Sequence, residues 1–223
     1  MSTHFAPAPL GARLRRAGSF CLDVFFPPVC AVCGRVGVLL CPGCEARLLP
    51  VAGDICGCCG RAMAAEVEWS RPLCRACRDA PLPLAQMRAP LRYAEPTSRL
   101  IHLLKYEGYF ALGRPLACLL VAGWPAWRPS PDLIVPIPLH PRRRFRRGYN
   151  QSELLARPLA EAVGVPFSAT ALRRTRRTAP QVGLGPEARA ANVQGAFDAT
   201  AGEAGGCSIL LIDDVLTLSL IHI

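Results

Sequence analysis

The sequence predicts an α/β protein in which a parallel sheet with flanking helices follows a small cysteine-rich region. Three observations lead to this fold class. Ten of the twelve cysteines lie before residue 80. Two short apolar segments, 132–139 and 208–217, are typical of strands. Leucines three or four residues apart indicate helices before and after the first of these segments.

The composition is that of a globular protein. Hydrophobic residues make up 51% of the 223 residues and charged residues 19%, which excludes a disordered chain. No stretch of 18 apolar residues occurs, so a membrane-spanning helix is not expected. The segment 13–29 has the basic start of a signal peptide, but Asp23 interrupts its apolar part and no small-residue cleavage site follows. We therefore expect a cytoplasmic protein, with residues 1–20 as an N-terminal segment outside its domains.

The net charge of +10 is carried almost entirely by arginine, because Lys105 is the only lysine among 26 basic residues. A basic protein can bind nucleic acid or phosphorylated ligands, and the charge alone does not choose between them. A single lysine in such a chain fits a position where arginine cannot substitute.

The cysteine-rich region contains four Cys-x-x-Cys pairs. Two residues between thiolates let a tight turn point both sulfurs at one Zn²⁺, and two such turns complete a tetrahedral site. Gly34 and Gly60 directly follow the second cysteine of a pair, where glycine fits the left-handed backbone that such turns need. Sites shared by neighbouring pairs are favoured over interleaved ones, since the gaps of 7 and 14 residues suit hairpins. We expect two structural zinc sites, with the ligands Cys30, Cys33, Cys41 and Cys44 in the first and Cys56, Cys59, Cys74 and Cys77 in the second.

A disulfide scaffold is the alternative for these eight cysteines. Without a secretion signal the chain stays in a reducing compartment, which favours zinc. Residues 21–80 are therefore predicted to form a double zinc ribbon that folds on its metal ions rather than on a large core. Closed four-sulfur sites leave no open position for a substrate, so catalysis at these zinc ions is not expected.

The segment 90–217 is predicted to form the α/β domain. A helical pattern of leucines starts at Thr97, where Thr97 or Ser98 can cap the helix, and Gly108 divides the pattern in two. A loop rich in proline and aromatic residues is expected from Trp124 to Pro131.

An anion site is predicted where the first strand meets the next helix. The arginine-rich stretch 142–147 follows the strand as a basic turn, and a helix then begins with Asn150 as its N-cap and Glu153 three residues later. Backbone N–H groups at a helix start, the helix dipole and the arginines all attract phosphate. A solvated basic loop and a nucleic-acid-binding patch are the alternatives.

Two acids follow the second predicted strand. The apolar residues Ile209–Ile212 indicate a strand that is buried on both faces, as in a parallel sheet, and Asp213 and Asp214 come next. Ligands of open α/β sheets bind beyond the carboxyl ends of the strands. Adjacent buried carboxylates also need hydroxyl groups, cations or a metal as partners. The pair is therefore a candidate ligand site.

Several motifs, taken in their order, resemble the ComF family. They are the cysteine-rich region, Leu104–Tyr106, the Arg-Gly-Tyr-Asn-Gln-Ser segment Arg147–Ser152, Thr178–Gln181, Arg189 with Asn192–Phe197, and Ile209–Thr217. The last of these resembles the ribose-5-phosphate-binding motif of type I phosphoribosyltransferases. The family consists of competence-associated, phosphoribosyltransferase-like proteins with an N-terminal double zinc ribbon, and the resemblance covers the chain from about residue 20 to 217.

The resemblance implies a type I phosphoribosyltransferase-like domain that binds phosphoribosyl pyrophosphate together with Mg²⁺. Asp213 and Asp214 would hold the ribose hydroxyls, with Thr217 in the same motif. The other implied site residues are Arg147, Gly148 and Asn150 near the pyrophosphate, and Thr178, Pro180 and Gln181 on a loop over the site.

The resemblance also implies a role in DNA uptake and natural transformation, with partners in that machinery such as a helicase. One interpretation is enzymatic, with displacement at the ribose C1 and pyrophosphate leaving toward Mg²⁺ and the arginines. The alternative is a non-catalytic module whose zinc ribbons and arginines hold single-stranded DNA or a partner protein. Aromatic residues make up only 7% of the chain, which weakens a base-stacking platform.

The sequence departs from the family pattern after Thr217, where a Thr-Gly-x-Thr loop, a helix and a further strand are expected. Residues 218–223 read Leu-Ser-Leu-Ile-His-Ile, which CTGTCTCTTATACACATC encodes. That string is the end sequence of a transposase used to prepare sequencing libraries, so we expect 218–223 to be adapter-derived, with a natural truncation as the alternative. Without the loop, the chain is expected to bind phosphoribosyl pyrophosphate weakly, to be inactive and to aggregate through its last strand.

Overall fold

The computed structural model describes residues 27–63, 72–127, 130–179, 183 and 185–216. The predictions on residues 1–20, Pro180, Gln181, Thr217 and 218–223 lie outside these ranges. The chain divides into two compact units, Met1–Ala46 and Arg47–Ile223. The division falls between the two cysteine quartets, so the second quartet belongs to the same unit as the α/β part of the chain.

The first unit is built around cysteines. A bridge between Val29 and Val36 and the short helix α2 (Pro42–Glu45) bring the first quartet together. A buried cluster of this unit consists of Cys30, Cys41 and Cys44, with Val32 and Leu40 packed against it. Thiols therefore occupy the place that large apolar side chains take in an ordinary core, as expected of a fold that depends on metal.

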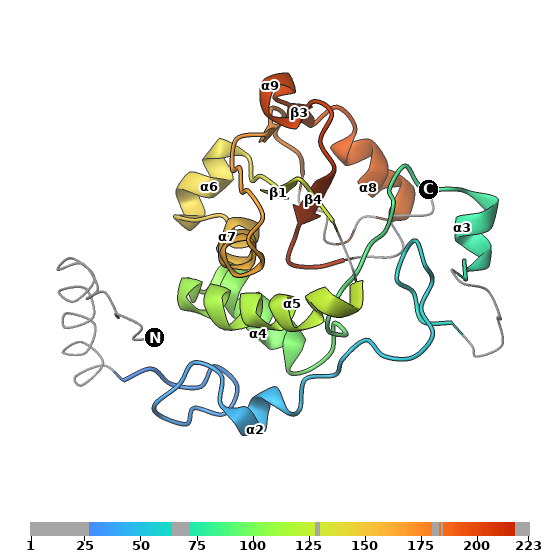
Figure 1. Ribbon diagram of the computed structural model, residues 1–223. Coiled ribbons are helices and arrows are strands. Elements are labelled where there is room, and N and C mark those ends of the chain that lie inside the picture. Colours follow the sequence, from blue (N-terminus) through green and yellow to red (C-terminus); the bar gives the residue numbers. More distant parts are fainter. Residues whose placement is uncertain (1–26, 64–71, 128–129, 180–182, 184, 217–223) are drawn as a thin grey trace, which may run out of the picture. The chain divides into compact units, whose positions relative to one another are not determined.

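The second unit contains the remaining elements, which Figure 1 labels. In chain order they are α3 (Arg75–Asp79), α4 (Thr97–Tyr106), the 3₁₀ helix η1 (Phe110–Leu112), α5 (Gly113–Trp127), β1 (Leu133–Pro136), α6 (Pro141–Arg147), α7 (Gln151–Val163), β2 (Leu172–Arg174), α8 (Pro186–Val193), β3 (Phe197–Ala199), α9 (Ala201–Ala204) and β4 (Ile209–Ile212). Across the described residues, no helix has both the length and the apolar character needed to cross a bilayer.

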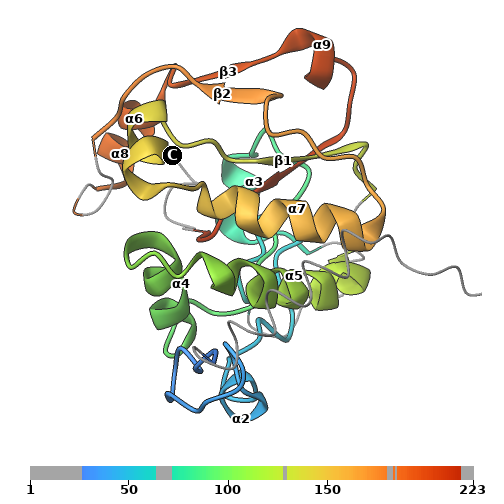
Figure 2. The ribbon, with the colours of Figure 1, turned by 90° about the vertical axis from the view of Figure 1, so that its left-hand side faces the viewer.

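Two parallel strands lie at the centre of the α/β part. β1 and β4 pair in register, with Leu133 opposite Ile209 and Pro136 opposite Ile212. Helix α7 contacts both strands and also α5, so it lies between the strand pair and α5 (Figure 2). β2 and β3 form a separate antiparallel pair. The parallel pair and its helices confirm the predicted α/β class.

Strand β4 is less buried than the sequence predicts. Ile209 and Leu211 are exposed, whereas β1 is buried at all four positions. Within the described part of the chain β4 pairs with β1 alone, so its other edge has no strand beside it. The expectation of a strand buried on both faces is therefore wrong for β4.

The helices before β1 follow the leucine pattern, with two differences at their ends. The pattern does break near Gly108, between α4 and η1. Neither Thr97 nor Ser98 caps α4, whose N-cap position is Pro96, and the Oγ of Ser98 donates to Glu95 Oε1 at 2.6 Å. The loop expected from Trp124 is also wrong, because α5 continues to Trp127. Packing of α5 against α7 outweighs the hydrogen bond that Pro125 removes.

The arginine-rich stretch forms a helix, α6, rather than the predicted turn. Pro141 occupies its start, a position that favours proline, and the Nδ1 of His140 accepts a hydrogen bond from the N–H of Arg142 at 3.3 Å. Helix α7 then begins as predicted, with the Oδ1 of Asn150 accepting from the N–H of Ser152 at 3.2 Å. The predicted order of strand, basic segment and helix start is kept.

Candidate functional site: two cysteine clusters and an acidic pair

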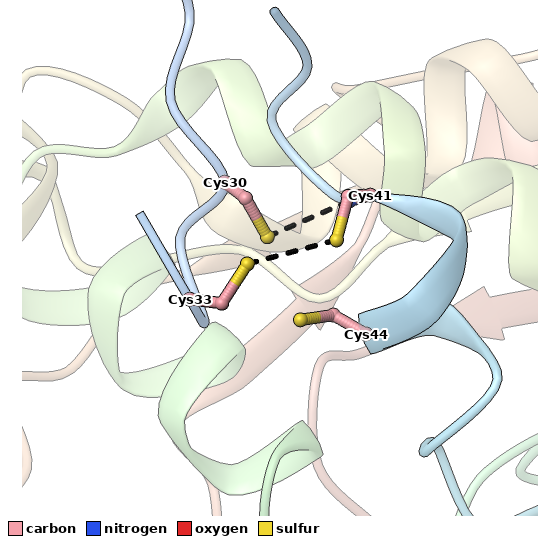
Figure 3. Close-up of side chains that lie close together, drawn as sticks. All are labelled: Cys30, Cys33, Cys41 and Cys44. Atoms are coloured by element: carbon pink, nitrogen blue, oxygen red, sulfur yellow. Dashed lines mark hydrogen bonds between the residues drawn. The ribbon is translucent and has the colours of Figure 1, made fainter. Parts of the chain in front are cut away.

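The first cysteine quartet forms a compact sulfur cluster. Its four Sγ atoms lie within 4.8 Å of one another, and the side chains converge from α2 and the preceding loop (Figure 3). The Sγ atoms of Cys33 and Cys41 are 3.7 Å apart. Zinc bonded to four sulfurs at about 2.3 Å holds them about 3.8 Å apart in a regular tetrahedron. The quartet therefore has the size of a tetrahedral zinc site.

The second quartet repeats this geometry. The Sγ atoms of Cys56, Cys59, Cys74 and Cys77 also lie within 4.8 Å of one another, and those of Cys59 and Cys74 are 3.8 Å apart. Cys58 is not part of the cluster, because its Sγ faces the carbonyl oxygen of Leu84 at 3.8 Å. The structure therefore confirms that neighbouring pairs share a site. Four sulfurs fill each coordination shell, so both are structural zinc sites.

The first turn of each quartet has the same backbone hydrogen bonds. The N–H of the leading cysteine donates to the carbonyl oxygen five residues later, at 2.7 Å from Cys30 and 2.8 Å from Cys56. The N–H groups of Gly34 and Gly60 donate back to the carbonyls of these cysteines at 2.8 and 3.0 Å. Both glycines have positive φ, 76° and 71°, as predicted for the residue after the second cysteine.

The same turns favour thiolate at their leading cysteines. Burial acts to raise the pKa of Cys30, but backbone N–H groups that point at its sulfur, including that of Cys41, outweigh it and lower the pKa to about 6. The same balance lowers the pKa of Cys56 to about 6, with the N–H of Cys74 donating to its Sγ at 3.3 Å. Zinc binds the thiolate form, so each turn prepares a ligand.

The acidic pair follows β4 directly. The Oδ1 of Asp213 accepts hydrogen bonds from the Oγ of Ser152 and from the N–H of Asp214, both at 2.9 Å. Asp213 is exposed as a residue, but neighbouring protein atoms partly desolvate its carboxylate. That desolvation, together with repulsion from Asp214, raises the pKa of Asp213 to about 7.

The second acid is held by the single lysine. Nζ of Lys105, in the last turn of α4, lies 2.8 Å from Oδ2 of Asp214. The Asp214 side chain is only 3% exposed, so its negative charge is compensated inside the protein. Two acids of one motif thus have different partners, a hydroxyl for Asp213 and an ammonium for Asp214.

A ring of hydrogen bonds joins the strand ends to the start of α7. The N–H of Ile137 donates to the carbonyl of Ile212 at 2.9 Å, and the carbonyl of Ile137 accepts from Nδ2 of Asn150 at 3.0 Å. Asn150 caps α7 at Ser152, and Ser152 binds Asp213. The helix start and the acidic pair are therefore on the same side of the strand pair, as the order of elements predicts.

Two sequence motifs that lie far apart in the chain meet at this point. The hydroxyl of Tyr149 donates to the carbonyl of Leu104 at 2.6 Å. The guanidinium of Arg147 lies over the ring of Tyr106, 5.6 Å from its centroid, and donates to Oε1 of Gln151. These contacts fix the last turn of α4, and with it Lys105, against the segment that precedes α7.

A half-buried arginine, Arg174, interacts electrostatically with Asp213. Burial lowers the pKa of Arg174 at the end of β2, the charge of Arg143 lowers it further, and that of Asp213 raises it. Its guanidinium stacks over Phe197 and donates to Oγ1 of Thr178. Nε of Arg174 is buried and has no hydrogen-bond partner among the described residues. A buried N–H donor without a partner is suited to an anionic ligand.

The loop that follows is held by an amide clamp. Oδ1 of Asn192 accepts from the N–H of Ala179 at 3.1 Å, and its Nδ2 donates to the carbonyl of the same residue at 3.0 Å. The adjacent Thr178 is buried. These contacts position the loop that contains Thr178, while Pro180 and Gln181 lie outside the described residues.

The sequence-predicted site residues are only partly brought together. Asp213, Asp214 and Asn150 converge, whereas Arg147 turns to Tyr106 and Gln151. Gly148 ends α6, and Thr217 lies outside the described residues. Their roles toward a ligand stay predictions.

Sequence reasoning missed two residues and one contact. Ser152 lies in a motif that the resemblance marks, so its position was the available signal. Arg174 carried no signal, because its location depends on the pairing of β2 with β3. The unusual identity of Lys105 indicated a special role, but nothing in the sequence pointed to Asp214 as its partner.

This organisation is shared with known proteins. A family model described as a double zinc ribbon domain matches residues 21–78. The chain is 34% identical over 197 residues to the DNA utilization protein YhgH of Salmonella typhi. The matched region covers 85% of this chain and 78% of that protein. It is 32% identical to Competence protein F of Haemophilus influenzae, over 80% of this chain and 78% of that protein. It is 26% identical to Competence protein ComFC of Bacillus subtilis, over 80% and 72%.

Proposed function

Because the chain belongs to the ComF family, we propose that its acidic pair binds the ribose of phosphoribosyl pyrophosphate and that the protein acts in DNA uptake. The relatives named for competence and for DNA utilization support the second part. For the first part, β1, β4 and α7 are assigned to a type I phosphoribosyltransferase-like core. Asp213 and Asp214 then stand at the carboxyl end of its central strand, where such sheets bind ligands.

The observation that carries this proposal is the meeting of the two acids with the start of α7. Asp213 and the helix start share the hydrogen bond from Ser152. Carboxylate oxygens accept hydrogen bonds from ribose hydroxyls, and a helix start favours phosphate. Arg174, whose pKa the charge of Asp213 raises, and Arg143, whose charge lowers the pKa of Arg174, would supply the positive charge that a pyrophosphate requires. Mg²⁺ accompanies that substrate and neutralises part of its charge.

A titration of the whole chain with the magnesium salt of phosphoribosyl pyrophosphate tests this proposal by calorimetry. We expect saturable binding that weakens at least about tenfold in Asp214→Asn, since a charge-assisted contact is lost. Asp198→Asn is the matched control, because Asp198 is an exposed acid of β3. Because the chain is expected to bind this ligand weakly, the titration extends to millimolar concentrations, and equal binding in both variants would contradict the assignment.

Single-stranded DNA is the second candidate ligand, and a surface of exposed aromatic and arginine side chains favours it. Phe145, within the arginines of α6, is 90% exposed, and Phe110 of η1 is 63% exposed. Tyr106 is also exposed beneath Arg147, and Phe110 lies edge-on to Tyr149. Aromatic faces interleaved with arginines stack bases and hold the phosphate backbone. The fold thus brings Phe110 to Tyr149 and Tyr106 to Arg147, and Phe145 lies on the same helix as Arg147.

Fluorescence anisotropy with a labelled oligothymidine tests this second candidate. The variant with Phe110→Ala and Phe145→Ala is expected to bind about tenfold or more weakly, and affinity should fall as salt rises. Tyr93→Ala is the control, because Tyr93 is equally exposed but lies outside this surface. Equal losses in the two variants would show that the surface is not the binding site.

A further inference from the structure

The segment 87–91 connects the second cysteine cluster with the cavity beside the acidic pair. The N–H of Met87 donates to the carbonyl of Cys58 at 2.7 Å, within the turn that holds the cluster. Gly60 of the same turn approaches so closely that a Cβ there would lie 2.7 Å from the carbonyl oxygen of Met87. One face of the segment is therefore packed directly against the cysteine turn.

Both terminal nitrogens of the Arg88 guanidinium reinforce this contact. Its Nη2 donates to the carbonyl of Gly57 at 2.9 Å. Its Nη1 donates to the carbonyl of Met87 at 2.7 Å and points at those of Cys56 and Cys58, each at 3.4 Å. The carbonyls of the turn face Arg88, while N–H groups of the turn point at the sulfur of Cys56. The planar fork of an arginine can engage several carbonyls at once, which an ammonium cannot do in the same way.

The other face of the segment forms a wall of a cavity. Arg88, Ala89, Pro90 and Leu91 line a cavity of about 140 Å³ together with Asp213, Asp214, Val215 and Leu216. Apolar side chains of α4 and α5, such as Ile101 and Leu116, complete it. The carbonyl of Pro90 accepts from the N–H of Val51 at 3.0 Å, which ties the wall to the chain before the cluster.

We propose that Arg88 is a positioning residue that couples zinc at the second cluster to the segment of the acidic pair. When zinc holds the turn of Cys56 to Cys59, the carbonyls stay in place, Arg88 holds the wall, and the wall confines residues 213–216. Loss of that zinc releases the carbonyls and loosens the wall. The first cluster belongs to the other compact unit. The coupling does not depend on which ligand the acids bind.

Two matched cysteine variants test the coupling in the whole chain. Cys77→Ser removes the fourth ligand of the second cluster and Cys44→Ser that of the first, and both thiols are equally buried. Each variant is expected to hold one zinc by elemental analysis. In Cys77→Ser, amide hydrogen exchange in 87–91 and 213–216 should rise about tenfold or more, whereas Cys44→Ser should leave both segments unchanged. Equal changes in the two variants would overturn the proposal.

Variants of Arg88 test the residue itself, with zinc retained. Arg88→Ala should keep two zinc ions but show faster exchange at 213–216, and Arg88→Lys should fall between it and the natural chain. With Co²⁺ in place of zinc, the absorption of the second site should shift in Arg88→Ala. Arg78→Ala, on the exposed side of α3, is the control and should change neither signal. Unchanged exchange in an Arg88→Ala chain that holds two metal ions would overturn the proposal.

A chelator titration covers the case in which Cys77→Ser or Arg88→Ala does not fold. In the natural chain, exchange at 213–216 is expected to follow the loss of zinc from the second cluster and not from the first. Amide exchange at 213–216 that follows the loss of zinc from the first cluster instead would refute the coupling. If the coupling holds and phosphoribosyl pyrophosphate still does not bind, only the proposed ligand is wrong.

Discussion

Nζ of Lys105 lies 2.8 Å from Oδ2 of Asp214, and this pair joins the end of α4 to the residue that closes β4. The lysine is partly exposed, at 22%, while the carboxylate is almost fully enclosed. A lysine tip is a compact point charge that fits beside one carboxylate oxygen, whereas a guanidinium is wider and planar. This geometry gives a physical reason for the one lysine in a chain that otherwise uses arginine.

Removal of the ammonium is expected to destabilise the protein. In Lys105→Met the buried carboxylate loses its cation, and the free energy of unfolding should fall by about 2 kcal/mol. Lys105→Arg should recover only part of the loss. Urea unfolding at pH 8 measures both values.

The double variant Lys105→Met with Asp214→Asn separates the pair from its surroundings. Because no charge is left unpaired, it should be more stable than the sum of the single losses, with an interaction energy of about 1 kcal/mol or more. Strictly additive losses would mean that the two groups do not interact in solution.

Zinc loss at one cluster should have local effects. Cys41→Ser is expected to lower the zinc content from two ions per chain to one and to unfold the first unit, because its buried cluster consists of zinc ligands. The pairing of β1 with β4, in the other unit, should persist. Elemental analysis and amide exchange of β1 measure these outcomes, and Cys118→Ser, outside both clusters, should change neither.

The raised pKa of Asp213 predicts a pH dependence of stability. Its pKa rises on folding from 3.8 to about 7, so the folded state binds this proton more tightly than the unfolded state. The resulting stabilisation is complete below about pH 4 and is lost as the pH rises through about 7. The stability of the natural chain relative to Asp213→Asn should therefore fall between pH 4 and 7 and be constant above about pH 8.

Urea unfolding of both chains between pH 5 and 8 measures this difference. Asp198→Asn should give a curve parallel to that of the natural chain over this range. A parallel curve for Asp213→Asn as well would show that Asp213 titrates normally when folded.

The amide clamp predicts a local change without a global one. Asn192→Asp keeps the acceptor for the N–H of Ala179 but loses the donor to its carbonyl. Amide exchange of residues 176–179 should rise, while global stability falls by less than about 1 kcal/mol, since the clamp is exposed. Gln194→Glu makes the same chemical change two residues later and should leave the loop unaffected; a similar rise there would count against the clamp.

Local signals in the sequence predicted the features that local chemistry decides. The Cys-x-x-Cys spacing, the glycine after each leading turn and the N-cap at Asn150 each depend on a few adjacent residues, and the structure has all of them. The arginine-rich stretch was predicted as a turn because of its charge. His140 and Pro141 favour a helix start there, and that signal is equally local.

Features that depend on distant residues were not predictable in the same way. The burial of Arg174 requires that Phe197 stack on its guanidinium across the β2–β3 pair. The partner of Lys105 requires that α4 end beside β4. The exposure of Leu211 depends on which strands flank β4. No periodicity or motif encodes such pairings within a single sequence.

Gly34 and Gly60, which follow the leading cysteine pair of each quartet, differ in the substitutions that they can accept. Both adopt a left-handed backbone, but a Cβ at Gly34 would meet nothing within 4 Å, whereas one at Gly60 would collide with the carbonyl of Met87. In a saturation library scored for cellular abundance, asparagine, which accepts this backbone, should survive at position 34 and be depleted at position 60. The two cysteine turns share one hydrogen-bond pattern, but their sequences are expected to diverge at different rates. The turn of the second quartet should change more slowly.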